Sequence, residues 1–250
     1  VAVMCGYTPS WSGGTIWRSP DAGQSWSDIQ SFNAACTFGY TRDALPVHAG
    51  NLIDYGRSMT VDLLCGELSG VTESQMLNGA NIAAYGAHGR WEIMRFTNAT
   101  LNADGSYTIS GLWRGDKGTE WATGLHQPTD SFVLLDDPDG AFIGVATELI
   151  GVPRYYRGIT SDADIESDTS LSFTYSGANL ECLSPVQAAG SRSAGDLLMT
   201  WKRRTRVGGE WRDNVDASLG ETSEAYEIDV MSGATVKRTI TATTQTATYT

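Results

Sequence analysis

Cysteine is scarce in this chain of 250 residues, and no two cysteines stand at the Cys-x-x-Cys spacing of a zinc ribbon. They lie far apart in the sequence, beside apolar or small residues in strand-like segments. This pattern excludes a disulfide-dense scaffold and predicts buried free thiols, with one long-range disulfide as the alternative. The four are Cys5, Cys36, Cys65 and Cys182.

Long apolar runs and basic residues are also lacking. No run reaches the roughly 18 residues of a membrane-spanning helix, so no membrane span is predicted. The 17 Lys and Arg residues are outnumbered by 29 Asp and Glu residues, which gives a net charge of −12. Nucleic acid and anionic membrane surfaces would repel such a chain, so neither is expected as a main partner.

What the sequence does contain is typical of β modules. It has 28 glycines and many short apolar runs, and its length can bury a sizeable core. The predicted fold class is mainly β, with tandem β-sandwich-like or β-barrel-like modules and one short helix. The chain opens on a strand pattern, Val1-Ala2-Val3-Met4-Cys5, without an initiator methionine. We therefore expect it to be a fragment of a larger protein.

The segment from Ser19 to Trp26 fits the Ser-x-Asp-x-Gly-x-x-Trp pattern of an Asp-box. In such a turn Asp21 caps backbone amides, Gly23 takes a positive φ, and Trp26 packs under the hairpin. Sialidase-type propellers repeat this box over four or more blades, so a single copy favours an ordinary β-hairpin. Strands are expected around it at residues 1–7, 15–18, 25–29 and 36–40.

Local signals predict one helix and a series of hairpins. Thr72 is a good N-cap, Gln75 completes a capping box, and Gly79 ends the helix. The Asp-Gly pair at residues 104–105 is a strong hairpin signal. That hairpin is expected over residues 101–109. Further strands are predicted at residues 59–66, 80–85, 91–96, 107–109, 131–135, 155–159 and 171–175.

A glycine-rich stretch, residues 111–126, lies between strand-like runs and reads as a long connection. Four glycines in this stretch indicate positive φ or close approach of the chain, and two tryptophans beside Arg114 and a lysine offer aromatic faces for cations. Such a connection must satisfy its own polar groups. We expect Arg114 and Glu120 to be largely buried partners.

The same stretch is the first place to look for catalysis. Asp116, Glu120 and His126 would be a plausible acid-base set if they converged, but their spacing does not bring them together. The tripeptide Arg114-Gly115-Asp116 matches an adhesion motif, although three residues are too few to support that function. No catalytic or cofactor-binding residue is predicted, and the protein is not expected to be an enzyme.

Metal binding has equally little support in the sequence. His48, His88 and His126 lack companions at ligand spacing, so we interpret them as surface or loop residues. The acidic run at residues 136–140 lacks the regular spacing and the later glutamate of a calcium loop, which favours a tight turn. No metal ligand and no cofactor are predicted.

The last part of the chain has the pattern of a β-sandwich. Residues 161–168 form an acidic, solvated loop, and Ser184-Pro185 marks a boundary. Beyond it, strands at residues 187–193, 196–202, 225–230, 236–240 and 246–250 resemble the front of a fibronectin type III-like domain with a core tryptophan, Trp201. The last two strands of such a domain are not in the sequence, so we expect an incomplete sandwich.

The order of these motifs resembles that of the large tail-tip, or baseplate hub, proteins of long-tailed phages and gene transfer agents. The resemblance rests on Gly111-Leu112-Trp113-Arg114-Gly115, then Gly118-Thr119-Glu120, then His126 and Phe132-Val133-Leu134-Leu135-Asp136, with Trp113 in place of the usual leucine. It extends over residues 59–136 and again over residues 183–230. The residues assigned to a structural motif by this resemblance are Arg114, Gly115, Gly118, Thr119, Glu120 and His126.

The resemblance implies a structural protein of the virion, at the distal end of the tail, that contributes to host attachment and tail assembly. The implied partners are other tail-tip and baseplate proteins, a homotrimer in the particle, and a host receptor or glycan. Two alternatives remain open: a sialidase-like glycosidase built on the Asp-box residues Ser19, Asp21, Gly23 and Trp26, and a carbohydrate-binding module.

The motifs divide the chain into four parts. Residues 1–50 form a β segment with the Asp-box hairpin, and residues 51–155 form an inserted β domain that holds the glycine-rich stretch. Residues 156–182 are returning strands and a linker, and residues 183–250 are the incomplete fibronectin type III-like domain.

Overall fold

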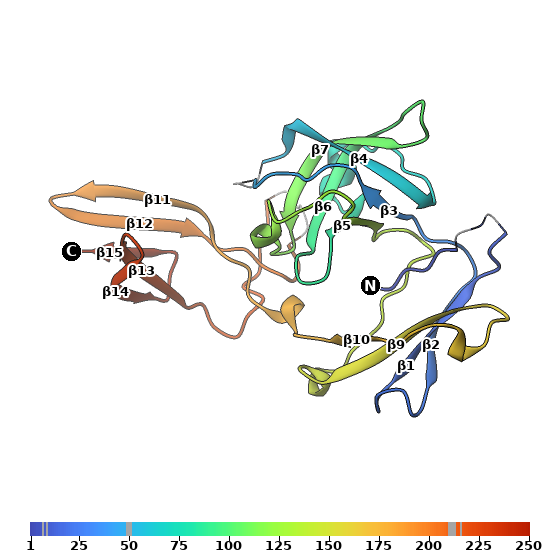
Figure 1. The fold of residues 1–250 in the computed structure, drawn as a ribbon. Helices are drawn as coiled ribbons and strands as arrows, with labels where there is room; N and C mark the ends of the chain where they lie inside the picture. Colours follow the sequence, from blue (N-terminus) through green and yellow to red (C-terminus); the bar gives the residue numbers. More distant parts are fainter. Residues whose placement is uncertain (7, 9, 49–51, 210–213, 216) are drawn as a thin grey trace. The chain divides into compact units, whose positions relative to one another are not determined.

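Strands dominate the computed structural model, which describes the whole chain except residues 7, 9, 49–51, 210–213 and 216 (Figure 1). The chain divides into two compact units, Val1–Leu180 and Glu181–Thr250. The prediction of a mainly β fold with one short α-helix is confirmed for the described residues.

The first unit contains ten strands, the α-helix and four short 3-10 helices among its described residues. They are β1 (Gly14–Ser19), β2 (Ser27–Phe32), β3 (Phe38–Thr41), β4 (Asp54–Cys65), α1 (Glu73–Leu77), β5 (Ile82–Gly86), β6 (Glu92–Leu101), β7 (Tyr107–Asp116), η1 (Glu120–Ala122), β8 (Ser131–Leu134), η2 (Thr147–Leu149), β9 (Pro153–Thr160), η3 (Ile165–Ser167), β10 (Leu171–Thr174) and η4 (Ala178–Leu180). The second unit contains β11 (Val186–Ser193), β12 (Asp196–Lys202), β13 (Tyr226–Ser232), β14 (Thr235–Ala242) and β15 (Thr246–Tyr249).

Six strands of the first unit close into a barrel in the order β3-β4-β7-β6-β5-β8, with β8 paired back to β3 (Figure 1). Every pair in the barrel is antiparallel. Closure removes the free edges of a sheet and gives each strand an inner and an outer face. On β4 the alternate residues Met59 and Val61 belong to the buried core.

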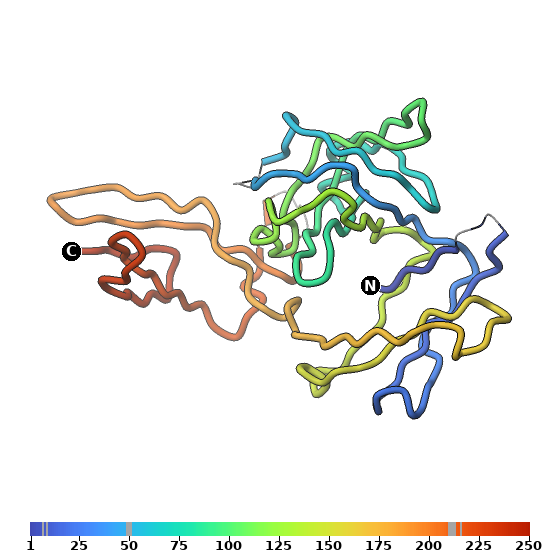
Figure 2. The backbone as a smooth tube through the Cα atoms, viewed as in Figure 1, coloured from blue at the N-terminus to red at the C-terminus, as the bar shows by residue number. Residues whose placement is uncertain are grey.

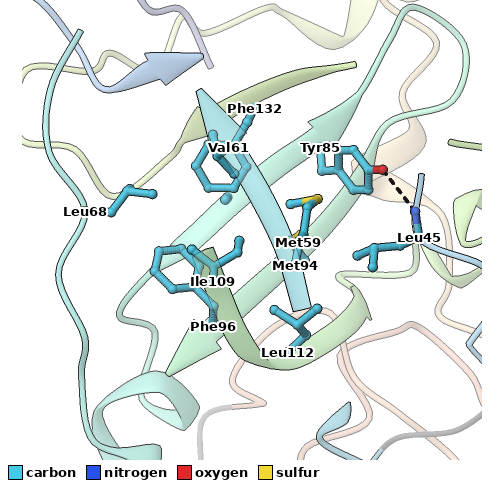
Figure 3. Close-up of a cluster of buried hydrophobic side chains, with 11 residues drawn as sticks. Leu45, Met59, Val61, Leu68, Tyr85, Met94, Phe96, Ile109, Leu112 and Phe132 are labelled. Carbon is cyan, nitrogen blue, oxygen red and sulfur yellow. Dashed lines mark hydrogen bonds between the residues drawn. The ribbon is translucent and has the colours of Figure 1, made fainter. Parts of the chain in front are cut away.

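One apolar core fills the barrel (Figure 3). The rings of Phe96 and Phe132 lie 6.2 Å apart within it. The Tyr85 hydroxyl accepts a hydrogen bond from the Leu45 amide at 3.3 Å and donates one to the Asp43 carbonyl at 3.0 Å. A fully buried large apolar side chain contributes about 1.5–3 kcal/mol relative to an exposed one, so this core is the main stabilising element of the unit. Its members are Leu45, Met59, Val61, Leu68, Ala83, Tyr85, Met94, Phe96, Ile109, Leu112 and Phe132.

The helix α1 forms for the local reasons predicted from the sequence. The Thr72 side chain accepts a hydrogen bond from the Gln75 amide at 3.3 Å, and the Gln75 side chain accepts one from the Thr72 amide at 2.9 Å. This reciprocal pair is the predicted capping box. Gly79 follows the helix with a φ of 111°, which accounts for a glycine at that position.

A second sheet of the first unit has the order β10-β9-β1-β2. Strand β1 pairs with β2 on one side and with β9 on the other, so strands from before and after the barrel lie side by side. Figure 2 shows this as the blue N-terminal trace running beside the yellow trace of β9. In sequence, the barrel is thus inserted between β2 and β9.

The second unit consists of two small sheets, β11-β12-β15 and β13-β14. In immunoglobulin-type sandwiches strands A, B and E share one sheet while C lies in the other, and the five strands here follow that arrangement. Trp201 of β12 packs edge-on against Tyr226 of β13, with ring centroids 5.0 Å apart. Among the described residues of this unit, only Trp201 is buried. Five strands in two small sheets therefore enclose very little core.

Among the described residues, one predicted strand is absent and one predicted connection is shorter than expected. Residues 1–6 form only an isolated bridge between Ala2 and Ala141, and residue 7 lies outside the described residues. The reason is that the backbone of Met4 hydrogen-bonds to Cys36, which lies before β3, and so does not pair with a strand. The glycine-rich stretch is also not a connection throughout, because β7 continues to Asp116. Glycine weakens the interior of a strand, but here two positive-φ glycines, Gly111 and Gly115, lie within β7 itself.

The barrel begins earlier in the chain than the predicted division near residue 50. Strand β3 at Phe38–Thr41 pairs with both β4 and β8, so it is part of the barrel. The predicted boundary at residue 51 falls outside the described residues. No local feature of β3 indicates that its partners lie after it in the chain.

Candidate functional site

We call the residues of the structural motif given by the resemblance the signature residues: Arg114, Gly115, Gly118, Thr119, Glu120 and His126. Two of them, Arg114 and His126, lie in a buried charge cluster, defined as Glu92, Arg114, His126, Asp130 and Arg90. Glu92 opens β6 and Arg114 lies near the end of β7, and these antiparallel neighbours bring the two side chains together. Arg114 donates from Nε to Glu92 Oε1 at 2.6 Å and from a terminal nitrogen to Oε2 at 2.8 Å. Both side chains have no exposed surface. This is a fully buried, bidentate ion pair.

Glu92 accepts two further hydrogen bonds. The Gly115 amide donates to Oε1 at 2.9 Å, and His126 Nε2 lies 2.7 Å from Oε2. Burial raises the pKa of this carboxyl, but the bonds from His126 and Arg114 outweigh burial, and the net effect is a pKa below the ordinary value. Glu92 is therefore a carboxylate inside the barrel.

On the side of His126 away from Glu92 lies a second ion pair, between Arg90 and Asp130. The His126 ring stacks on Tyr85 with centroids 3.7 Å apart, and Nδ1 lies 3.5 Å from a carboxylate oxygen of Asp130. Arg90 holds Asp130 through both carboxylate oxygens, and the Gln127 amide donates to it at 3.0 Å. Burial raises the pKa of Asp130. The hydrogen bonds from Arg90 lower it by more than burial raises it, so the net pKa lies below the ordinary value.

The cluster as a whole places two carboxylates, two guanidinium groups and one imidazole at one end of the barrel. That end is defined by the start of β6, the end of β7 and the start of β8. Taking such charges out of water is costly, and the mutual attraction and hydrogen bonds must offset that cost. Two buried atoms, a terminal nitrogen of Arg114 and Nδ1 of His126, have no hydrogen-bond partner. The cluster is closed to solvent at its centre.

The predicted pairing of Arg114 with Glu120 is wrong, because Arg114 forms its ion pair with Glu92. Arg114 lies on the inner face of β7, whereas Glu120 begins η1 after the strand has ended. Glu120 packs instead against Gly115, where an added Cβ would lie 2.8 Å from the Glu120 Cα. Gly115 has a φ of 64°, so both the space and the backbone conformation require glycine.

The remaining signature residues build the turn after β7. Gly118 has a φ of 86°. The Thr119 hydroxyl donates to the Asp116 carbonyl at 2.7 Å and accepts from the Ile93 amide at 2.8 Å. Asp116 itself forms an ion pair with Arg95 at 2.7 Å. Asp116 thus pairs with Arg95 and His126 with Glu92, so these two side chains have different partners.

The interpretation of all three histidines as surface or loop residues holds for His88, which is exposed. His126 does lie in a loop, between η1 and β8, but its side chain is fully buried and not at the surface. His48 is partly buried and lies 3.6 Å from Asp54. The burial of His126 was not predicted because the loop that carries it folds inward over the barrel end, which a lone histidine in a glycine-rich sequence does not reveal.

Sequence reasoning missed Glu92, Arg90 and Asp130. A signal for Glu92 was available: it alternates with Met94 and Phe96 on β6, and both of these are fully buried. A charged residue in phase with two core residues points inward, and an inward charge needs a partner. Asp130 and Arg90 lie outside any strand and carry no such signal.

The Asp-box turn has the predicted geometry. Asp21 accepts hydrogen bonds from the Ser25 amide at 2.9 Å and from the Ser25 hydroxyl at 2.6 Å. Its pKa is lowered to about 2, chiefly by the Ser25 bonds. The Ser19 hydroxyl accepts from the Gly23 amide at 2.8 Å, and Gly23 has a φ of 93°. Trp26 donates to the Gly23 carbonyl at 3.1 Å, and the turn joins β1 to β2.

The acidic run at residues 136–140 is a turn, as predicted. Asp137 accepts from the Thr37 amide at 2.6 Å and the Asp139 amide at 2.9 Å, and the Gly140 amide donates to the Asp137 carbonyl at 3.0 Å. In the described part of the chain, no group of three or more His, Cys, Asp or Glu side chains could hold a metal ion. None of the helices described there is long and apolar enough to cross a membrane.

The four cysteines are free thiols. Cys36 is buried, and Cys5 and Cys65 are partly buried, broadly as predicted. The prediction is wrong for Cys182, which is exposed because it lies between η4 and β11, where no core covers it.

A comparison with known families finds a match over the barrel. The family model described as Rcc01698-like, C-terminal, matches residues 36–133. Those residues run from just before β3 to β8 and contain the whole buried charge cluster. No curated protein matches the chain. The chain is therefore similar, over its barrel, to the Rcc01698-like C-terminal family.

Proposed function

We propose that this chain is a structural component of the distal tail of a phage or gene transfer agent, within the tail tip or baseplate hub. The observation that carries the proposal is the use of the signature residues. Arg114, Gly115 and His126 converge on Glu92 inside the barrel, so the signature is a set of residues that builds one barrel end. Residues that stabilise the fold of their own module, and do not form an open site, are what we expect in a structural protein.

The proposal includes the absence of catalysis. Enzymatic acids and bases must reach a substrate, but Glu92, Arg114 and His126 have no exposed side-chain surface. The exposed face of the same loop carries Trp121 and Leu125, which are 60% and 49% exposed. Neither side chain is an acid, a base or a nucleophile.

The glycosidase alternative has less support. The Asp-box occurs once and joins β1 to β2 in a four-stranded sheet that also contains β9 and β10. Repeated blades, on which a propeller depends, have no counterpart among the sheets described for this chain. A carbohydrate-binding role is compatible with exposed aromatic residues, but no site-specific contact favours it.

Assembly is the second part of the proposal. In the second unit β13 pairs only with β14 among the described residues, and β15 pairs only with β12. Unpaired edges of this kind are templates for another strand. We therefore expect a homotrimer in the particle, together with other tail-tip and baseplate proteins. The net charge of −12 opposes self-association of the isolated chain, which should be monomeric in dilute solution.

Electron microscopy of intact particles tests the location. Antibodies raised against the 250-residue chain should label the distal end of the tail, and prior adsorption of the serum with the purified chain should abolish the label. Label on the capsid, or its absence from particles whose protein contains this segment, would overturn the proposal. A reconstruction should then contain three copies about the tail axis, and a single copy would refute the trimer alone.

A further inference from the structure

Three of the four cysteines gather where the first residues of the chain meet the barrel. The Met4 carbonyl accepts from the Cys36 amide at 2.9 Å, and the Met4 amide donates to Cys36 Sγ at 3.5 Å. One residue beyond Cys5, the Gly6 carbonyl accepts from Cys65 Sγ at 3.2 Å. Cys5 is thus flanked by contacts to Cys36 on one side and to Cys65 on the other.

The barrel fixes the positions of the two other thiols. Cys65 is the last residue of β4 and pairs across the ladder with Phe38 of β3, two residues after Cys36. Cys65 Sγ donates to the carbonyl of Gly6, the residue that follows Cys5. The Cys65 sulfur therefore lies beside the Cys5–Gly6 backbone, and this proximity favours pairing of Cys65 with Cys5.

The surroundings distinguish Cys65 from Cys36. Cys36 is fully buried, donates to the Asp139 carbonyl at 3.2 Å and accepts from Met4, so its sulfur is fully engaged. Cys65 is partly exposed and lines a cavity of about 430 Å³ together with Trp11 and Leu63. A small reagent can reach Cys65 through that cavity, whereas Cys36 is sheltered.

We propose that Cys5 and Cys65 are a disulfide-forming pair that covalently fastens the first residues of the chain to β4 of the barrel. The oxidant is a low-molecular-weight disulfide. The Cys65 thiolate attacks one of its sulfurs and expels one small thiol, leaving a mixed disulfide on Cys65. Cys5 then loses its proton to water, attacks Cys65 Sγ and expels the second small thiol. Two protein thiols are oxidised and one small disulfide is reduced to two thiols, so atoms and electrons balance.

The second step should be the slower one. Burial and the neighbouring Cys65 raise the pKa of Cys5 to about 12, so only a small fraction is thiolate at neutral pH. Formation of the bond should therefore accelerate as the pH rises. The bond would hold a segment whose described β pairing to the rest of the unit is one isolated bridge, Ala2 to Ala141.

Peptide mapping tests the pair directly. The 250-residue chain with Cys182→Ser, which removes the exposed thiol, is incubated with oxidised glutathione at pH 8 and digested without reduction. We expect a cross-linked peptide joining Cys5 to Cys65 and a fall from three free thiols to one. Cys36→Ser in the same background is the matched control and should retain the cross-link.

Stability supplies a second readout that does not depend on any single variant. The oxidised chain should unfold at a higher temperature than the reduced chain, and the difference should vanish in Cys5→Ser and in Cys65→Ser. A glutathione adduct on Cys65 that never resolves, a bond from Cys5 to Cys36, or three thiols that persist would each overturn the proposal.

Discussion

Replacing Glu92 with glutamine should strongly destabilise the barrel. The carboxylate accepts four hydrogen bonds, two from Arg114, one from the Gly115 amide and one from His126. Glutamine has nearly the same shape but only one acceptor oxygen, and its amide nitrogen would face a donor. The substitution therefore leaves the Arg114 charge buried without its counter-charge.

The magnitude follows from that uncompensated charge. Breaking a buried ion pair by removing one partner costs about 3–5 kcal/mol. In a unit of roughly 150–250 residues each kcal/mol lowers Tm by about 2–4 °C, so the variant should melt about 6–20 °C below the parent chain. An isosteric change without loss of a buried charge would have a far smaller effect.

Urea unfolding followed by tryptophan fluorescence is a suitable assay, because Trp91 and Trp113 lie on the barrel beside the cluster. Asp62→Asn is the matched control. Asp62 forms a bidentate pair with Arg42, but both side chains are about half exposed, so water screens the interaction and little stability should be lost. The two units can unfold separately, so the barrel transition must be fitted by itself.

The reasoning would be refuted if Glu92→Gln shifted the barrel transition no more than Asp62→Asn does. That result would mean that water reaches the cluster and solvates the Arg114 charge when Glu92 is lost. An Arg114→Met variant checks this, because it removes the stranded charge. Combined with Glu92→Gln, it should recover part of the stability lost in the glutamine variant.

Three further predictions concern the same region. Gly115→Ala should destabilise the barrel, because the new Cβ would lie 2.8 Å from the Glu120 Cα. Gly105→Ala is the control: open space surrounds it, so it should add only the backbone strain of its positive φ, and thermal melts compare the two variants. The pKa values of Glu92 and Asp130 are lowered on folding, so their contribution to the free energy of unfolding is fully present above the ordinary carboxyl pKa values of 4.5 and 3.8. It should be lost as the pH falls through the lower folded values, and unfolding measured over an acid pH series would show this. Sialosides and peptidoglycan should not be turned over by the chain, and product release that is lost in a folded Glu120→Ala variant would contradict the non-enzymatic assignment.

Features set by a few neighbouring residues could be predicted from the sequence. The capping box at Thr72 and Gln75 needs four residues of context, and the Asp21 turn needs eight. The hairpin at Gly105 follows from the Asp-Gly pair that precedes the start of β7. In each case the hydrogen-bond partners lie within one turn of chain, so no knowledge of the fold is required.

Features that depend on barrel closure could not be predicted in this way. Arg114 was assigned an acidic residue from the same stretch of sequence, Glu120, but its partner is Glu92 on the adjacent strand. The choice is made by strand register, and register is set by the pattern of the entire sheet. His126 is buried for a similar reason, because Tyr85, on which it stacks, comes from another strand of the barrel.

The insertion of the barrel between β2 and β9 has a consequence for the order of folding. Strand β1 must pair with β9 across the whole intervening chain, and closing so long a loop carries an entropy cost that delays such contacts. Pairing of Phe38 on β3 with Val133 on β8 removes most of that cost, because it brings the entry and exit of the barrel together. We expect the barrel to fold early as a nucleus and the β10-β9-β1-β2 sheet to assemble afterwards on its joined ends.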